Sequence, residues 1–120
     1  MIDNSYKYDL EDRTAVFAEK VIELCKKIQK HVVVTPLIDQ LVRSGTSIGA
    51  NYCEANGASS RKDFKNKIHI CKKEAKETMY WLRILAKADD LHKEECRNLW
   101  KEAHELAKIF SSIAAKISKV

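Results

Sequence analysis

One proline and three glycines in 120 residues leave this chain few positions at which a helix has to stop. Between those positions the apolar residues recur at steps of three and four, a spacing that places them on one face of an α-helix. The pattern occurs in four segments joined by short links. We therefore predict an all-α chain that folds as an antiparallel up-down-up-down four-helix bundle, with residues 1–120 forming one domain.

The bounds of the first two helices follow from breaks in this pattern. We expect the first helix at about residues 12–31, because the β-branched run at residues 32–34 then interrupts the spacing. Thr35 is a typical capping residue and Pro36 suits the first helical position, so the second helix is predicted to begin there. Its end is predicted at Gly57, in the left-handed conformation that often follows a last helical turn.

The third and fourth helices have the clearest core positions. Ser60 followed by Asp63 is typical of a capping box and predicts the start of the third helix. Its predicted core positions alternate steps of four and three: Phe64, Ile68, Cys71, Ala75, Thr78, Leu82 and Leu85. After a link at residues 88–90, the fourth helix repeats the rule with Leu99, Ala103, Leu106, Phe110, Ile113 and Ile117.

The stretch RSGTSIGANYCEA, residues 43–55, places Gly45 and Gly49 one helical turn apart. A phosphate-binding loop would carry its glycines just before a helix N-terminus, after a strand and with a Lys-Ser/Thr pair, and this context is missing. Glycine inside a helix costs about 1 kcal/mol relative to alanine, a cost that close approach of a neighbouring helix offsets. We therefore interpret both glycines as packing positions.

Apolar residues cover about half of the second predicted helix. One arc holds Leu37, Leu41, Ser44, Gly45, Ile48, Tyr52 and Ala55, and a second group of four residues widens it: Ile38, Val42, Gly49 and Cys53. Either this helix is packed deeply at the centre of the bundle, or the second group contacts another subunit. We take these four residues as the candidate oligomer interface. The polar face of the same helix, which carries Arg43, Ser47, Asn51 and Glu54, is expected to form hydrogen bonds at i,i+4 spacing.

A resemblance to a known family appears in two neighbouring stretches. LVRSGTSIGANYCEA, residues 41–55, and SSRKDFKNKIHICKKEAKETMYWLRIL, residues 59–85, resemble the signature of the bacterial 23S rRNA intervening-sequence proteins, a four-helix-bundle family. The matching positions are Arg43, Ser44, Ser47, Ile48, Asn51, Glu54, Ala55, Phe64, Glu74, Ala75, Glu77, Trp81 and Leu82. Where the family often has Ile-Ala-Glu-Gly after the asparagine, this chain has YCEANG. The resemblance implies a cytoplasmic bundle, often a ring-like homopentamer, with no established enzymatic activity.

The positive charge of the chain is concentrated on the third predicted helix. The formal net charge is +5, and eight cations of this helix fall on an arc of about 120°: Arg61, Lys62, Lys65, Lys72, Lys73, Lys76, Arg83 and Lys87. Asp63, Glu74 and Glu77 fall on the opposite flank, and Lys67 lies outside the arc. We call the eight cations the basic stripe. Either it is only a solvated face, or it contacts phosphates of nucleic acid at the level of the backbone.

These features lead to three alternative functions. The first is a non-enzymatic homo-oligomer that binds structured RNA, or a protein that processes RNA or DNA, through the basic stripe. The second is an assembly or adaptor protein whose stripe meets an acidic protein. The third is a metal-independent ribonuclease, because Arg97 and His104 resemble the Arg-x(4–6)-His motif of the HEPN ribonucleases, although roughly 10 Å along one helix is a loose spacing for a shared phosphate.

Metal, cofactor and membrane binding are not predicted. Cys25, Cys53, Cys71 and Cys96 are too widely spaced for a zinc site, and we expect four buried, reduced thiols. No segment approaches the roughly 20 apolar residues of a membrane span, and the N-terminus has no secretory signal pattern. We therefore expect a soluble cytoplasmic protein without a cofactor.

Overall fold

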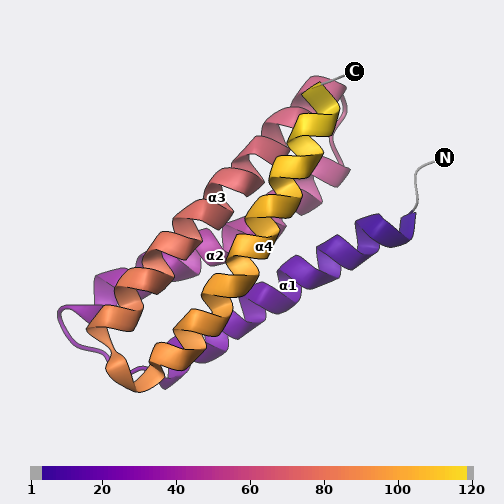
Figure 1. The fold of residues 1–120 in the computed structure, drawn as a ribbon. Helices are drawn as coiled ribbons and strands as arrows, with labels where there is room; N and C mark the ends of the chain where they lie inside the picture. Colours follow the sequence, from indigo (N-terminus) through magenta and orange to yellow (C-terminus); the bar gives the residue numbers. More distant parts are fainter. Residues whose placement is uncertain (1–3, 119–120) are drawn as a thin grey trace.

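The computed structural model describes the backbone of residues 4–118 and the side chains of residues 10–118. The elements in chain order are α1 (Asn4–Lys27), α2 (Val34–Asn56), α3 (Arg61–Ala88), the 3-10 turn η1 (Asp90–His92) and α4 (Lys93–Ser118). The described part of the chain has no strand, and its four long helices run alternately up and down (Figure 1). The predicted all-α four-helix bundle is confirmed. No helix in this part is both long and apolar enough to cross a membrane.

The helix α3 lies at the centre of the packing. It contacts α2 on one side and α4 on the other, whereas α1 packs mainly on α2 and touches α4 less. In Figure 1 the first half of α1 diverges from α4, and the elongated bundle measures 48 × 22 × 20 Å. The buried apolar side chains of the four helices form one cluster.

The predicted core seams of α3 and α4 are confirmed. All the predicted positions of α3 are buried except Phe64, which is half-buried near the start of the helix. In α4 the first four predicted positions are buried, whereas Ile113 and Ile117, close to its end, are half-buried. Apolar residues that recur at steps of three and four therefore identify the core positions correctly wherever neighbouring helices cover the helix.

The predicted start of α2 is wrong. The helix begins at Val34, and Val33 before it provides no side-chain cap. Thr35 is already helical: its Oγ1 donates a 3.0 Å hydrogen bond to the carbonyl oxygen of His31. Val34 is fully buried, so packing of this side chain in the core brings the chain into the helix ahead of the polar residue that was expected to cap it. The first helix also differs, since α1 begins at Asn4 and ends at Lys27.

Of the two predictions for the α2–α3 link, the one for the end of α2 is wrong and the one for the start of α3 is confirmed. Gly57 has φ −97° and ψ 8°, so the predicted left-handed conformation is wrong. The helix ends instead in tight hydrogen bonds, from Gly57 N–H to the Glu54 carbonyl and from Ala58 N–H to the Ala55 carbonyl, both 3.1 Å. The predicted cap of α3 is confirmed, because Ser60 Oγ accepts a 3.0 Å hydrogen bond from Asp63 N–H.

Both glycines within α2 lie against α1. A Cβ at Gly49 would stand 2.9 Å from Thr14 Oγ1 and 3.1 Å from Thr14 Cβ, and a Cβ at Gly45 would stand 3.2 Å from Val21 Cγ2. Thr14 is fully buried, and its hydroxyl is held by the Leu10 carbonyl at 2.9 Å. The packing interpretation is thus confirmed: the missing side chains allow α1 to approach α2.

Candidate nucleic-acid interface

The acidic flank of α3 is bound to α2. Arg43 of α2 forms an ion pair with Glu74, at 3.2 Å between Nη1 and Oε1, and a second one with Glu77. Trp81 Nε1 donates a 3.0 Å hydrogen bond to Glu77. Glu74 is only 8% exposed, so this carboxylate depends on Arg43 for compensation of its charge. Two of the three acids opposite the basic stripe, Glu74 and Glu77, are therefore engaged within the chain.

Two hydroxyl groups add to this α2–α3 contact, and other polar groups of α2 bond within their own helix. Thr78 Oγ1 lies 3.0 Å from Ser44 Oγ in the buried layer between the two helices. On the polar face of α2, Ser47 Oγ donates to the Arg43 carbonyl at 2.6 Å and Asn51 Nδ2 donates to the Ser47 carbonyl at 2.8 Å, which confirms the i,i+4 bonds expected there. Several residues of the family-like signature, Arg43 and Ser44 among them, thus serve helix packing.

The basic stripe runs beside the groove between α3 and α4. At one end, Arg61 Nη2 donates a 3.0 Å hydrogen bond to the carbonyl oxygen of Ile117, in the last turn of α4. Further along, Lys76 and Arg83 line hollows whose other walls come from α4. Lys65 and Lys72 are half-buried, and the other members of the stripe are exposed. The stripe therefore forms one edge of a surface that α4 continues.

None of the eight stripe cations forms an ion pair with a carboxylate among the side chains of residues 10–118. Lys67, the basic residue of α3 outside the arc, does: it lies 2.7 Å from Glu54, and this hydrogen bond and the charge of Glu54 raise the pKa of the lysine. Two cations of α1, Arg13 and Lys27, likewise pair with acids of α4. Direct ion pairing is thus found away from the stripe, and six of the eight stripe residues are exposed.

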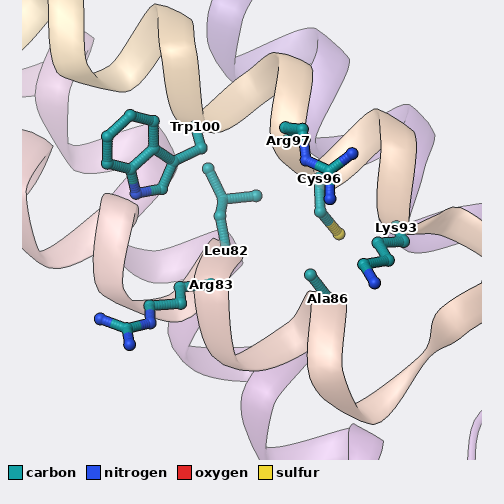
Figure 2. A pocket seen from close by; sticks show the side chains of 7 residues that line it. All are labelled: Leu82, Arg83, Ala86, Lys93, Cys96, Arg97 and Trp100. Carbon is teal, nitrogen blue, oxygen red and sulfur yellow. The ribbon is translucent and has the colours of Figure 1, made fainter.

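The helix α4 adds cations along the same groove. A hollow of about 420 Å³, drawn in Figure 2, is lined by Leu82, Arg83 and Ala86 of α3 and by Lys93, Cys96, Arg97 and Trp100 of α4. A second hollow, of about 430 Å³, is lined by Lys76, Met79, His104, Ala107, Lys108 and Ser111. The candidate interface therefore consists of the basic stripe together with the α4 cations of these two hollows.

The prediction from the sequence did not include the α4 residues of this surface. Lys93, Arg97, Trp100, His104 and Lys108 recur at steps of four and three, so they share one face of the helix. This spacing could have revealed them as a group. Their meaning depends on that face lying beside the stripe of α3, which only the packing of the two helices decides.

The two residues of the ribonuclease alternative lie in different hollows. Arg97 lines the first one and pairs with Glu94 at 3.0 Å. His104 lines the second one, and its ring centroid lies 5.2 Å from that of Trp100. Neither hollow brings the arginine and the histidine together as lining groups.

The expectation of four buried thiols is wrong for Cys53, which is exposed at the outer edge of α2. The other three cysteines are buried and free. Burial raises the pKa of Cys25 to about 11 and the pKa values of Cys71 and Cys96 to about 12, so these thiols stay neutral. Within the described residues, no cluster of His, Cys, Asp and Glu side chains is suited to hold a metal ion.

The four residues of the candidate oligomer interface have different surroundings. Ile38 is buried in the bundle, Val42 is half-buried against the core, and Gly49 lies against Thr14. Cys53 is the exposed member of the group. The interface itself stays a prediction.

Two comparisons place this architecture among known proteins. Residues 7–112 match the family model of the 23S rRNA-intervening sequence protein. A crystal structure of a protein with unknown function from the S23 ribosomal protein family of Bacteroides thetaiotaomicron is 39% identical and has a TM-score of 0.77; the alignment covers 87% of this chain and 96% of that one. No curated protein matches the chain significantly.

Proposed function

This chain belongs to the 23S rRNA-intervening sequence protein family, and from that premise we propose that it is a cytoplasmic, non-catalytic, oligomeric bundle that binds structured RNA. The contact surface is the basic stripe with the adjoining cations of α4. The observation that carries the proposal is the absence of carboxylate partners for the stripe among the described side chains. When such cations bind phosphates, they displace the counterions that are condensed on the nucleic acid. The release of these counterions is the main source of affinity for a nucleic-acid backbone.

The shape of the stripe supports backbone binding. From Arg61 to Lys87 it extends roughly 39 Å at 1.5 Å per residue, so it follows a nucleic-acid strand over several phosphates. Lysine and arginine side chains on a convex helix neutralise phosphates without reading base edges. We therefore expect weak sequence preference and strong dependence on salt. In a cyclic oligomer the stripe is repeated around the ring, which strengthens the field on the RNA.

Titration of RNA at several salt concentrations tests this proposal. The logarithm of the binding constant should fall with the logarithm of salt concentration, with a slope of about −0.7 to −0.9 per phosphate contacted. Replacing Lys65, Lys72 and Lys76 together by Glu reverses the centre of the stripe and leaves the buried seam of α3 unchanged. Binding should be lost while the circular dichroism spectrum stays helical.

A matched triple variant controls for net charge. Lys20→Glu, Lys26→Glu and Lys30→Glu make the same change in net charge at three exposed positions of α1 and the link after it. This variant should weaken RNA binding much less than the stripe variant does. If both weaken it equally, or if the unmodified protein binds no RNA at low salt, the stripe is a solvated face or meets an acidic protein instead.

The non-catalytic part of the proposal has its own test. RNA incubated with the protein in EDTA should remain intact, because Arg97 and His104 line separate hollows. Cleavage that needs no metal and disappears in His104→Ala would establish the ribonuclease alternative.

A further inference from the structure

The hollow in Figure 2 combines an apolar floor with a cationic rim. Its floor contains Leu82, which is fully buried, and Cys96, which is 1% exposed. Trp100 forms one wall and is half-buried, so part of its indole is accessible from the hollow. Arg83 of α3 and Lys93 of α4 both line the space, and Figure 2 shows the Arg83 side chain on the Trp100 side, turned away from Lys93. A ligand complementary to this site has a flat apolar body and a negative group beside it.

We propose that this hollow binds one unpaired nucleotide of RNA, with the base against the Trp100 indole and the adjoining phosphate held by Lys93 and Arg97. The inference rests on the proposed function and defines a subsite within it. The volume of about 420 Å³ falls in the range of small-molecule pockets, roughly 300–1,000 Å³. Stacking on an aromatic side chain accepts any base, since every base has a π-face.

The charges around the hollow favour an anionic ligand. Arg83 and Lys93 have no carboxylate partner among the described side chains, and Glu94, the partner of Arg97, is itself highly exposed. Desolvation by burial raises the pKa of Cys96 to about 12, so the floor carries no negative charge near neutral pH. A phosphate that approaches the α4 side of the hollow therefore meets Lys93 and Arg97 beside a neutral floor.

Base pairing decides which RNA uses the site. In a duplex the bases are stacked on one another and paired, and only the backbone is available to the stripe. In a loop or bulge a base turns outward and can enter the hollow. The structure thus separates two contributions: the stripe binds phosphates of any RNA, and the hollow adds affinity only for RNA with an unpaired base.

Two variants and two RNAs test the subsite. Trp100→Leu removes the stacking surface, and Ala86→Leu fills the hollow from α3 without changing charge. With a labelled stem-loop RNA, fluorescence anisotropy should show about tenfold weaker binding for each variant. With a fully paired RNA duplex of equal length, affinity should change less than twofold. Ala50→Leu, at an exposed position of α2, is the matched control and should change neither affinity.

Tryptophan fluorescence gives a second measurement that needs no substitution in the hollow. The chain has two tryptophans, so Trp81→Phe leaves Trp100 as the reporter. The stem-loop should quench its emission and the duplex should not. Equal quenching by both RNAs, or equal loss of stem-loop and duplex affinity in Trp100→Leu and Ala86→Leu, overturns the subsite and leaves RNA binding by the stripe intact. Failure of the unmodified protein to bind either RNA overturns both proposals.

Discussion

Gly49 and Gly57 differ in what a side chain would meet. At Gly49 an added Cβ lies 2.9 Å from the hydroxyl of buried Thr14, whereas at Gly57 the nearest atom is the Glu54 carbonyl oxygen at 3.8 Å and φ is −97°. We expect Gly49→Leu to lower the free energy of unfolding by about 1–3 kcal/mol through overpacking against α1. Gly57→Ala should raise it by about 0.4–1 kcal/mol, because alanine restricts the unfolded chain and fits this conformation. Urea unfolding followed by circular dichroism measures both, and equal midpoints for the two variants would contradict the close approach of α1 and α2.

The contact between α2 and α3 depends on one arginine that compensates a nearly buried acid. In Arg43→Leu, Glu74 would keep a side chain that is 11% exposed and lose its cationic partner. We expect a loss of about 1–3 kcal/mol in the free energy of unfolding. Lys108→Leu is the control, because its pair with Glu105 is exposed and lies within one helix, where such pairs contribute little. Adding Glu74→Gln to Arg43→Leu should restore part of the lost stability. If the double variant is no more stable than Arg43→Leu, the buried charge is not the cause.

The assembly of the whole molecule can be followed through its thiols. Light scattering coupled to size exclusion should give a mass several times 13.8 kDa, with a pentamer expected from the family resemblance. At pH 8, a thiol reagent should leave the three buried cysteines unmodified and react with Cys53 slowly in the oligomer and faster as dilution dissociates it. Because burial raises the pKa values of the other thiols above the ordinary value of 9, the unfolded chain releases protons first, and stability should fall as the pH rises beyond about 9. A concentration-independent monomer with rapidly reacting Cys53 would contradict the predicted interface.

Features that depend on neighbours within about four residues were determined by the sequence alone. The number of helices, the seam of α3 and the Ser60 cap follow from the 3.6-residue repeat and from side-chain bonds to the nearest backbone. The basic stripe belongs to the same class, because all its members lie on one helix. At Thr35 and Gly57 the same local reasoning failed. The burial of Val34 moved the start of α2, and a tight helical turn rather than a left-handed glycine ended the same helix.

Only the tertiary structure decided which faces of different helices meet. Periodicity fixes the residues that share a face of α4, but it does not specify whether that face lies toward α3, α1 or solvent. The pairing of Arg43 with Glu74 and the hollow beside Trp100 therefore could not be derived from spacing. Each joins residues separated along the chain by more than the four positions over which a helix repeats, and side-chain packing across the helices brings them together.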